Sequence, residues 1–214
     1  LHSAVDLIRD RNILACGRGG DGKGVGTHCH GAGTHEAKAA IDRVDVKLAN
    51  AGVSIEDASI MYDGSYYSIG YPDGDVPANI GVCTDVIIRA YRILGIDLQK
   101  EVHEDVLKNN DAYSRIKKID KNIDHRRVPN LATFFKRHGK VLPITNDPKD
   151  YKPGDVIWWN LSPAGSLNHI GLVVNEKSAD GLRYLVIHNM GGGQVIEDFL
   201  FGAKIVGHYS YQKK

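Results

Sequence analysis

The stretch that decides the fold of this chain is residues 81–94, GVCTDVIIRAYRIL. Its apolar residues recur every three or four positions, at Val86, Ile87, Ala90, Tyr91 and Leu94. This spacing predicts a helix that packs one face on a core, with Cys83 in its first turn. A helix N-terminus carries free N–H groups and a partial positive charge, which favour the nucleophilic thiolate. The alternative at this point is a structural cysteine, because free cysteine is often buried.

Composition describes an ordinary globular protein. The chain has 214 residues, 42% of them hydrophobic and 25% charged, which suits one domain with a real core. Its net charge of +1 gives no reason to expect a nucleic-acid partner, and no apolar run is long enough for a transmembrane helix. The chain begins at Leu1, which leaves a removed signal peptide open. A disulfide between Cys16 and Cys29 would leave Cys83 as the lone thiol and would suggest export.

Residues 1–33 form a glycine-rich arm, which we separate from a domain at 34–214. Residues 17–23 spell G-x-x-x-x-G-K, but Gly24 stands where a phosphate-binding loop needs Ser or Thr. Metal-ligand residue types crowd there without the spacing of a closed site: Cys16, His28, Cys29, His30 and His35. We therefore expect no cofactor and no metal.

The remaining elements favour an α+β fold. Helical patterns cover residues 36–49, where Gly52 should end the helix, and then 98–109 and 130–138. Strand patterns cover residues 156–159, 169–174, 184–188 and 205–211. Helices followed by strands predict a nucleophile-bearing helix packed against a C-terminal antiparallel meander.

Two histidines complete a candidate catalytic triad. His169 begins one strand and His188 ends the next, so an antiparallel pairing brings both to the same sheet edge. A helix across that edge would bring Cys83 within reach, with His169 as the base and His188 orienting it. Asn189 competes for the orienting role, but its side chain should point the other way on a regular strand.

Several motifs carry a resemblance to a known family. They are YPDGDVP, GVCTDVIIRAYR, DLQKEVHEDV, DKNIDHRRVPNL, YKPGDVIWW, NHIGLVV, VIHN and GHYSY. With them the chain, from about residue 53 to 211, resembles the bacterial domain-of-unknown-function family numbered 1287. That family is grouped with the NlpC-type cysteine hydrolases of the papain-like superfamily, which cleave peptide bonds in peptidoglycan stems. The resemblance implies a papain-like, NlpC-type fold.

The resemblance also assigns roles to individual residues. Cys83 opening a helix, His169 in HIG and His188 in VIH match the NlpC-type pattern one by one. NlpC-type enzymes also place a tyrosine about a dozen residues before the cysteine, which suggests Tyr71, with Tyr62 and Tyr66 as alternatives. The usual D-C-S is replaced here by V-C-T, and the acid, Asp85, follows two residues later.

The expected function is therefore a cysteine peptidase or amidase acting on peptidoglycan outside the cytoplasm. Arg126 and Arg127 are suited to grip substrate carboxylates, although a solvated charge run is the simpler interpretation. Three alternatives stay open. The domain could be a non-catalytic wall-binding module, or an antibacterial toxin with an immunity or inhibitor protein as partner. The third is a metal hydrolase using some of four histidines, His103, His125, His169 and His188.

Overall fold

The computed structural model describes residues 44–165 and 167–213. The glycine-rich arm, the pairing of Cys16 with Cys29, the boundary between residues 33 and 34 and the first part of the helix expected at 36–49 lie outside these residues. These four expectations remain predictions.

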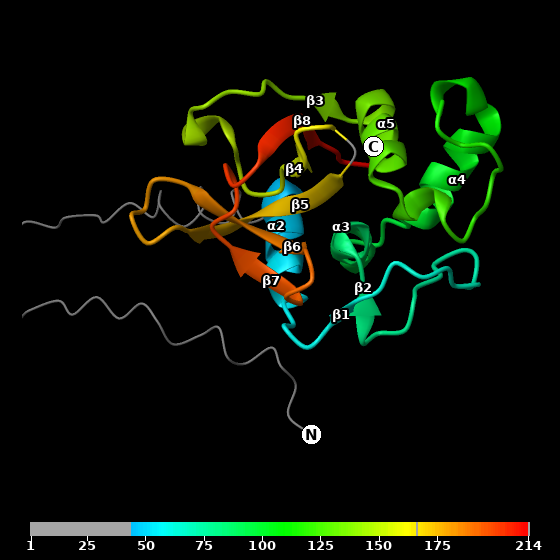
Figure 1. Ribbon diagram of the computed structural model, residues 1–214, viewed down its shortest axis with the longest axis horizontal. Helices are drawn as coiled ribbons and strands as arrows, with labels where there is room; N and C mark the ends of the chain where they lie inside the picture. The colour runs from blue at the N-terminus through cyan, green and yellow to red at the C-terminus, as the bar shows by residue number, and fades with distance from the viewer. Residues whose placement is uncertain (1–43, 166, 214) are drawn as a thin grey trace, which may run out of the picture.

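The centre of the fold is an antiparallel sheet in the order β3-β8-β4-β5-β6-β7 (Figure 1). The strands are β3 (Lys140–Val141), β4 (Val156–Asn160), β5 (Asn168–Lys177), β6 (Tyr184–Asn189), β7 (Gln194–Glu197) and β8 (Lys204–Ser210). Strands β4 to β6 form the expected meander, and β7, which is not among the expected strands, extends it. However, β8 does not extend it. It returns to pair with β4 on the other side, with Val156 opposite Tyr209.

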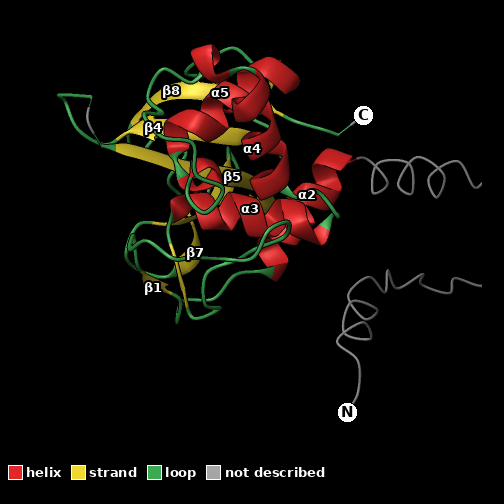
Figure 2. Ribbon diagram, turned by 90° about the vertical axis from the view of Figure 1, so that its right-hand side faces the viewer, coloured by secondary structure: helices red, strands yellow, loops and turns green. Residues whose placement is uncertain are grey.

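Among the described residues, four α-helices lie beside the sheet: α2 (Val44–Ser54), α3 (Cys83–Ile93), α4 (Leu98–Lys108) and α5 (Val128–His138). Short 3₁₀ helices follow at Asn110–Ala112, Asp124–Arg126 and Pro148–Asp150. Figure 2 shows the helices gathered on one side of the sheet. A small parallel ladder of β1 (Met61–Tyr62) and β2 (Ile80–Gly81) leads into α3.

Helix α2 does not end at Gly52 as expected. It continues to Ser54, because Gly52 faces the sheet rather than capping the helix. A Cβ at this position would lie 2.9 Å from Leu172 and 3.2 Å from Ile187. The glycine therefore permits close contact between α2 and strands β5 and β6.

Apolar side chains bury both faces of the sheet. The larger cluster joins α2, α3, α4 and α5 to the sheet and includes Ile170, Leu172 and Ile187. A smaller cluster on the other face includes Trp159 and Val173. Since successive side chains of a strand alternate between faces, this division fixes which residues of β5 face the helices.

Helix α3 is the most buried of the helices that the structure describes. Val86, Ile87, Ala90 and Tyr91 are all fully buried, and burial of a side chain such as Val86 or Ile87 contributes about 1.5–3 kcal/mol. The expected α+β fold is therefore confirmed, with the cysteine-bearing helix packed against an antiparallel sheet. Within the described residues, no helix is both long and apolar enough to cross a membrane.

Candidate active site

Cys83 is the first residue of α3 and is 5% exposed. Val82 before it is extended, and its N–H donates to Asp85 Oδ2 at 2.7 Å. This bond from the first turn of α3 fixes the backbone at the point where the chain enters the helix. A cavity of about 230 Å³ lies in front of the thiol and is lined by Tyr62, Asn168 and Arg127, among others.

Burial dominates the acidity of the thiol. It raises the pKa of Cys83 to about 11, although the backbone N–H groups of Ile170, Thr84 and Cys83 itself act in the opposite direction. The helix N-terminus therefore stabilises the thiolate as expected, but burial destabilises it more. Transfer of a negative charge from water into the protein interior costs more free energy than the hydrogen bonds from these N–H groups contribute. At neutral pH, Cys83 rests as a thiol.

His169 and His188 form the buried polar centre of the other face of the sheet. Nε2 of His169 lies 2.9 Å from Nδ1 of His188, a hydrogen bond whose donor depends on the tautomer. Nε2 of His188 lies 3.1 Å from Oε2 of Glu197, outside the angles of a hydrogen bond, and the two form an ion pair only when His188 is protonated. The ring of Phe199 stacks on His188 at 5.0 Å. Two histidines and a carboxylate therefore form a chain that ends at the surface.

Both imidazoles favour the neutral form. Burial, and then the neighbouring His188, lowers the pKa of His169 to about 3. Burial also lowers the pKa of His188, while Glu197 raises it. At neutral pH, His169 is therefore a neutral imidazole, with one protonated nitrogen and one nitrogen that can accept a proton.

The thiol and the histidine pair meet at the first residues of β5 but are not bonded. Ile170 faces α3, and its N–H points at the sulfur of Cys83. His169, one residue earlier, packs with Trp159 on the opposite face, at 5.8 Å between ring centroids. No hydrogen bond joins Cys83 to His169 in the part of the chain that the structure describes. The structure thus brings His169 and His188 together and places Cys83 beside the same strand end.

Asn189 does not contact His169. Its Nδ2 donates to the carbonyl of Gly81 at 3.3 Å, and its Oδ1 accepts from the N–H of Gly191 at 3.0 Å. Of the two residues that compete to orient His169, only His188 touches it. Asn189 instead ties β6 to the strand that leads into Cys83.

The tyrosine beside the cysteine is Tyr62, and the choice of Tyr71 was wrong. Tyr71 packs edge-on against His103 at 5.4 Å, away from the thiol cavity. Tyr66 donates to Asp120 at the surface. Tyr62 lines the cavity because β1 pairs with β2 and sets Tyr62 opposite Gly81. A pairing of two-residue strands leaves no periodic signal in the sequence.

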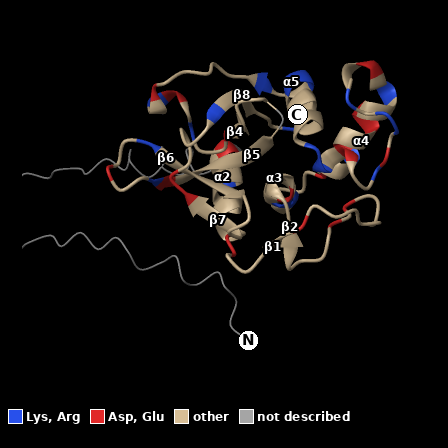
Figure 3. Cartoon of the chain, in the orientation of Figure 1, with Lys and Arg blue, Asp and Glu red and all other residues tan. Residues whose placement is uncertain are grey.

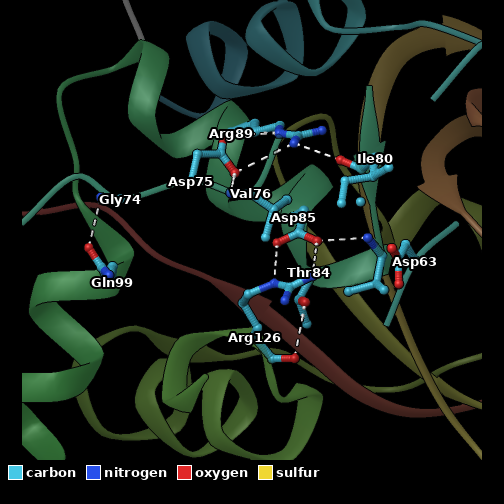
Figure 4. A network of polar contacts seen from close by, with 12 residues as sticks. Asp63, Gly74, Asp75, Val76, Ile80, Thr84, Asp85, Arg89, Gln99 and Arg126 are labelled. Carbon is cyan, nitrogen blue, oxygen red and sulfur yellow. Dashed lines mark hydrogen bonds and ion pairs between the residues drawn. The ribbon is translucent and has the colours of Figure 1, made fainter. Parts of the chain in front are cut away.

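Arg126 borders the thiol cavity, but its guanidinium is bonded to Asp85 rather than left available to a substrate carboxylate (Figure 4). Its Nε and Nη2 donate to the two carboxylate oxygens of Asp85, each at 2.9 Å, and both side chains are only 2% exposed. The carbonyl of Arg126 accepts from Thr84 Oγ1 at 3.2 Å. The third nitrogen, Nη1, donates to the carbonyl of Ser65 at 3.4 Å, so all three nitrogens are bonded within the protein and we assign Arg126 to the framework. Arg127 is exposed and lines the thiol cavity, and it remains a candidate.

The histidines of the metal alternative are dispersed. His103 Nδ1 lies 3.4 Å from Asp124 Oδ2, and His125 is buried with its Nδ1 unpartnered within the described residues. Burial lowers the pKa of His125 to about 3. Across the described residues, no three His, Cys, Asp or Glu side chains are grouped as a metal site.

The sequence prediction missed Glu197. Strand β7 has only four residues, and its sequence, QVIE, does not alternate between polar and apolar residues. It pairs with β6, with Val195 opposite His188. Glu197 is two residues from Val195 and so lies on the same face of the sheet. The available signal was the pair of β-branched residues Val195 and Ile196 after the glycines at 191–193.

Comparison with known proteins agrees with the family suggested by the motifs. The model of the family described as "Domain of unknown function (DUF1287)" matches residues 48–211. The uncharacterized protein YijF of Escherichia coli (strain K12) is 47% identical over 173 residues, which cover 76% of this chain and 83% of YijF.

Two solved structures from Trichomonas vaginalis are also similar. NlpC1 has a TM-score of 0.44 and 16% identity, and the match covers 81% of this chain and 46% of NlpC1. NlpC2 has a TM-score of 0.45 and 17% identity, with 79% and 47% covered. The chain thus spans less than half the length of either protein. The family match extends over most of the chain, and this protein belongs to the DUF1287 family.

Proposed function

We propose that this protein is a papain-like cysteine hydrolase that cleaves an amide bond in the stem peptides of bacterial peptidoglycan. The observation that carries the proposal is the strand end of β5. There the N–H of Ile170 points at the thiol of Cys83, while the adjacent His169 is bonded to His188. A nucleophile, a base and a group that orients the base are the parts of the generalised triad.

The proposed reaction begins from a neutral pair, since Cys83 rests as a thiol and His169 as an imidazole. The proposed reaction therefore requires the side chain of His169, at the start of β5, to move toward the face of Cys83 when substrate binds. The sulfur attacks the carbonyl carbon while its proton passes to His169. Collapse of the tetrahedral adduct expels the amine, which takes that proton, and leaves a thioester. Water, deprotonated by His169, then releases the acid and restores the thiol.

The developing oxyanion needs donors in the cavity. The backbone N–H of Cys83 at the start of α3 is one, and the hydroxyl of Tyr62 is the second. His188 and Glu197 hold the ring of His169 and stabilise its transient positive charge. Action on peptidoglycan places the protein outside the cytoplasm in this proposal.

A specific observation favours a second function. The thiol is buried, has a raised pKa and lacks a bond to His169, as an inert structural cysteine would. The second candidate is therefore a non-catalytic module that binds the cell wall through the same cavity.

Digestion of purified peptidoglycan tests the proposal, with released fragments identified by mass spectrometry. We expect fragments from the wild type and none from Cys83→Ala, and their masses identify the cleaved bond. The chain has three cysteines, so Cys16→Ser/Cys29→Ser is the matched control that keeps Cys83 and should keep activity. Equal products from wild type and Cys83→Ala would exclude thiol catalysis.

Alkylation reports the state of the thiol, and release of fragments separates the two candidates. The rate of reaction of Cys83 with iodoacetamide should increase from pH 8 to about pH 11 in the free protein, in line with the raised pKa. A hydrolase substrate should protect the thiol or be cleaved. A wall-binding module would bind peptidoglycan equally well with and without Cys83→Ala and release nothing.

A further inference from the structure

The cavity in front of Cys83 does not end there. A second cavity of about 490 Å³ shares Ile123, Arg127, Pro129 and Asn168 with it, so the two form one continuous groove. The second cavity runs beneath the segment between α4 and α5 and is lined by Arg115, Lys117 and Lys118. The groove thus leads from the candidate nucleophile to a segment that the proposed reaction does not use.

This groove is strongly basic. The side chains of Arg115, Lys117, Lys118 and Arg127 are all exposed. None of the four has a hydrogen bond or ion pair to another side chain of the described residues. Basic residues recur along the segment between α4 and α5, on the right of Figure 3. Four unpaired cations beside one cavity repel one another and favour an anionic ligand.

The acidic residue of the lining does not neutralise these cations. Asp124 is buried, and its carboxylate accepts from the N–H of Asp120 at 2.9 Å and lies 3.4 Å from His103. By contrast, Arg126 is already paired with Asp85 (Figure 4). Adjacent arginines therefore have opposite roles, and the cationic lining is available to a ligand.

Polar groups in the groove also suit a peptide backbone. Asn168 Oδ1 accepts from Trp158 Nε1 at 3.0 Å, which leaves its Nδ2 as a donor at the junction of the two cavities. Asn130 donates its Nδ2 to the carbonyl of Asp124 and keeps its Oδ1 as an acceptor. The first turn of α5 adds the partial positive charge of a helix N-terminus.

We infer that this groove is a subsite for an acidic peptide segment, which binds Arg115, Lys117, Lys118 and Arg127 through clustered carboxylates while the scissile amide lies at Cys83. The inference rests on the proposed function. It adds that the anionic part of the substrate lies on the side of Cys83 where the second cavity is. Guanidinium groups hold carboxylates in a bidentate fork, whereas lysines add charge without fixed geometry.

Binding to the full-length Cys83→Ala protein tests this subsite without requiring hydrolysis. The probe is a fluorescein-labelled peptide with four glutamates, measured by fluorescence anisotropy at low salt. An otherwise identical peptide with four glutamines is the neutral probe. We expect the glutamate probe to bind at least about tenfold more tightly than the glutamine probe, and to weaken as salt increases.

Charge reversal locates the binding. Lys117→Glu/Lys118→Glu should weaken the glutamate probe at least about tenfold. Lys149→Glu/Lys152→Glu changes the net charge equally on exposed residues outside the groove and should have little effect. Arg127→Gln gives a second, milder variant, and circular dichroism verifies that each variant is folded.

Three outcomes would overturn the inference: absence of binding, equal binding of both probes, or an equal loss in the control variant. Tighter binding of inorganic polyphosphate than of the glutamate probe would also overturn it, in favour of a phosphate polymer. Failure of the proposed hydrolysis would be seen in the digestion experiment, where wild-type protein would leave peptidoglycan intact. The binding assay is independent of this result, because it uses Cys83→Ala protein without the thiol.

Discussion

Two buried polar groups lie on opposite faces of the sheet, and they differ in how completely their atoms are partnered. On the helix side, Asp85 and Arg126 use two parallel hydrogen bonds and are both 2% exposed. On the other side, His169 and His188 share one bond, and the chain ends at Glu197, whose side chain is 52% exposed. The first group is closed, whereas the second can still accept and pass on a proton.

This difference distinguishes residues with a structural role from residues suited to catalysis. A closed, bidentate ion pair fixes the first turn of α3 and has no capacity left for a ligand. A neutral imidazole with one partner keeps a nitrogen available as a base. The chemistry of a residue type alone does not reveal its role, since Arg126 and Arg127 are neighbours in sequence and only Arg127 is exposed.

Loss of the base should have the largest effect. We expect His169→Gln to reduce the rate of peptidoglycan hydrolysis by about 10²–10⁴, the range typical of a general base. The matched control is His208→Gln, because His208 is equally buried on β8 but is bonded to Asp155 and Pro143. Its rate should be retained. Equal losses in the two variants would assign His169 to the framework.

Breaking the closed pair should act on stability. Arg126→Met leaves Asp85 buried without its partner and should lower the free energy of unfolding by about 3–5 kcal/mol. Urea unfolding followed by circular dichroism measures the change. Arg127→Met is the adjacent control and should stay within about 0.5 kcal/mol. Adding Asp85→Leu to Arg126→Met should recover part of the loss, and a double variant as unstable as the single one would contradict this explanation.

Acid should destabilise both regions through their buried histidines. The pKa values of His125 and His169 are about 3 in the folded state, below the ordinary 6.5. Between these values the unfolded chain binds more protons, so stability should fall as pH falls from 6.5 towards 3. The slope approaches about 1.4 kcal/mol per pH unit for each histidine. Urea midpoints between pH 4 and 6.5 measure it, and His125→Gln should reduce the slope without removing it.

The exposed end of the histidine chain should matter least. Glu197→Gln should slow hydrolysis by no more than about fivefold, because a half-exposed ion pair contributes about 0.2–1 kcal/mol. Since Glu197 raises the pKa of His188, its loss should also move the acidic limb of the pH–rate profile to lower pH. The control is Asp198→Asn, at the next residue, which breaks an ion pair to Arg183. An unchanged profile in Glu197→Gln would separate Glu197 from the reaction.

Local patterns were sufficient for most of the fold. The helix that begins at Cys83, the helices starting near residues 98 and 130, and the strands carrying His169 and His188 were all readable from periodicity. The end of α2 at Ser54, beyond Gly52, and the return of β8 to β4 were not. Both depend on how closely separate elements pack. The pattern of a single sequence segment carries no information about this packing.

For the candidate site, the sequence by itself determined which residue types begin α3 and occupy the ends of β5 and β6. Only the tertiary structure decided their surroundings. It replaced Tyr71 with Tyr62, enclosed Arg126 with Asp85, added Glu197 to the histidines and set His169 on the face opposite Cys83. The physical reason is that helical and strand periods are short-range properties of the backbone. Hydrogen-bond partners and burial, by contrast, arise between segments far apart in the chain.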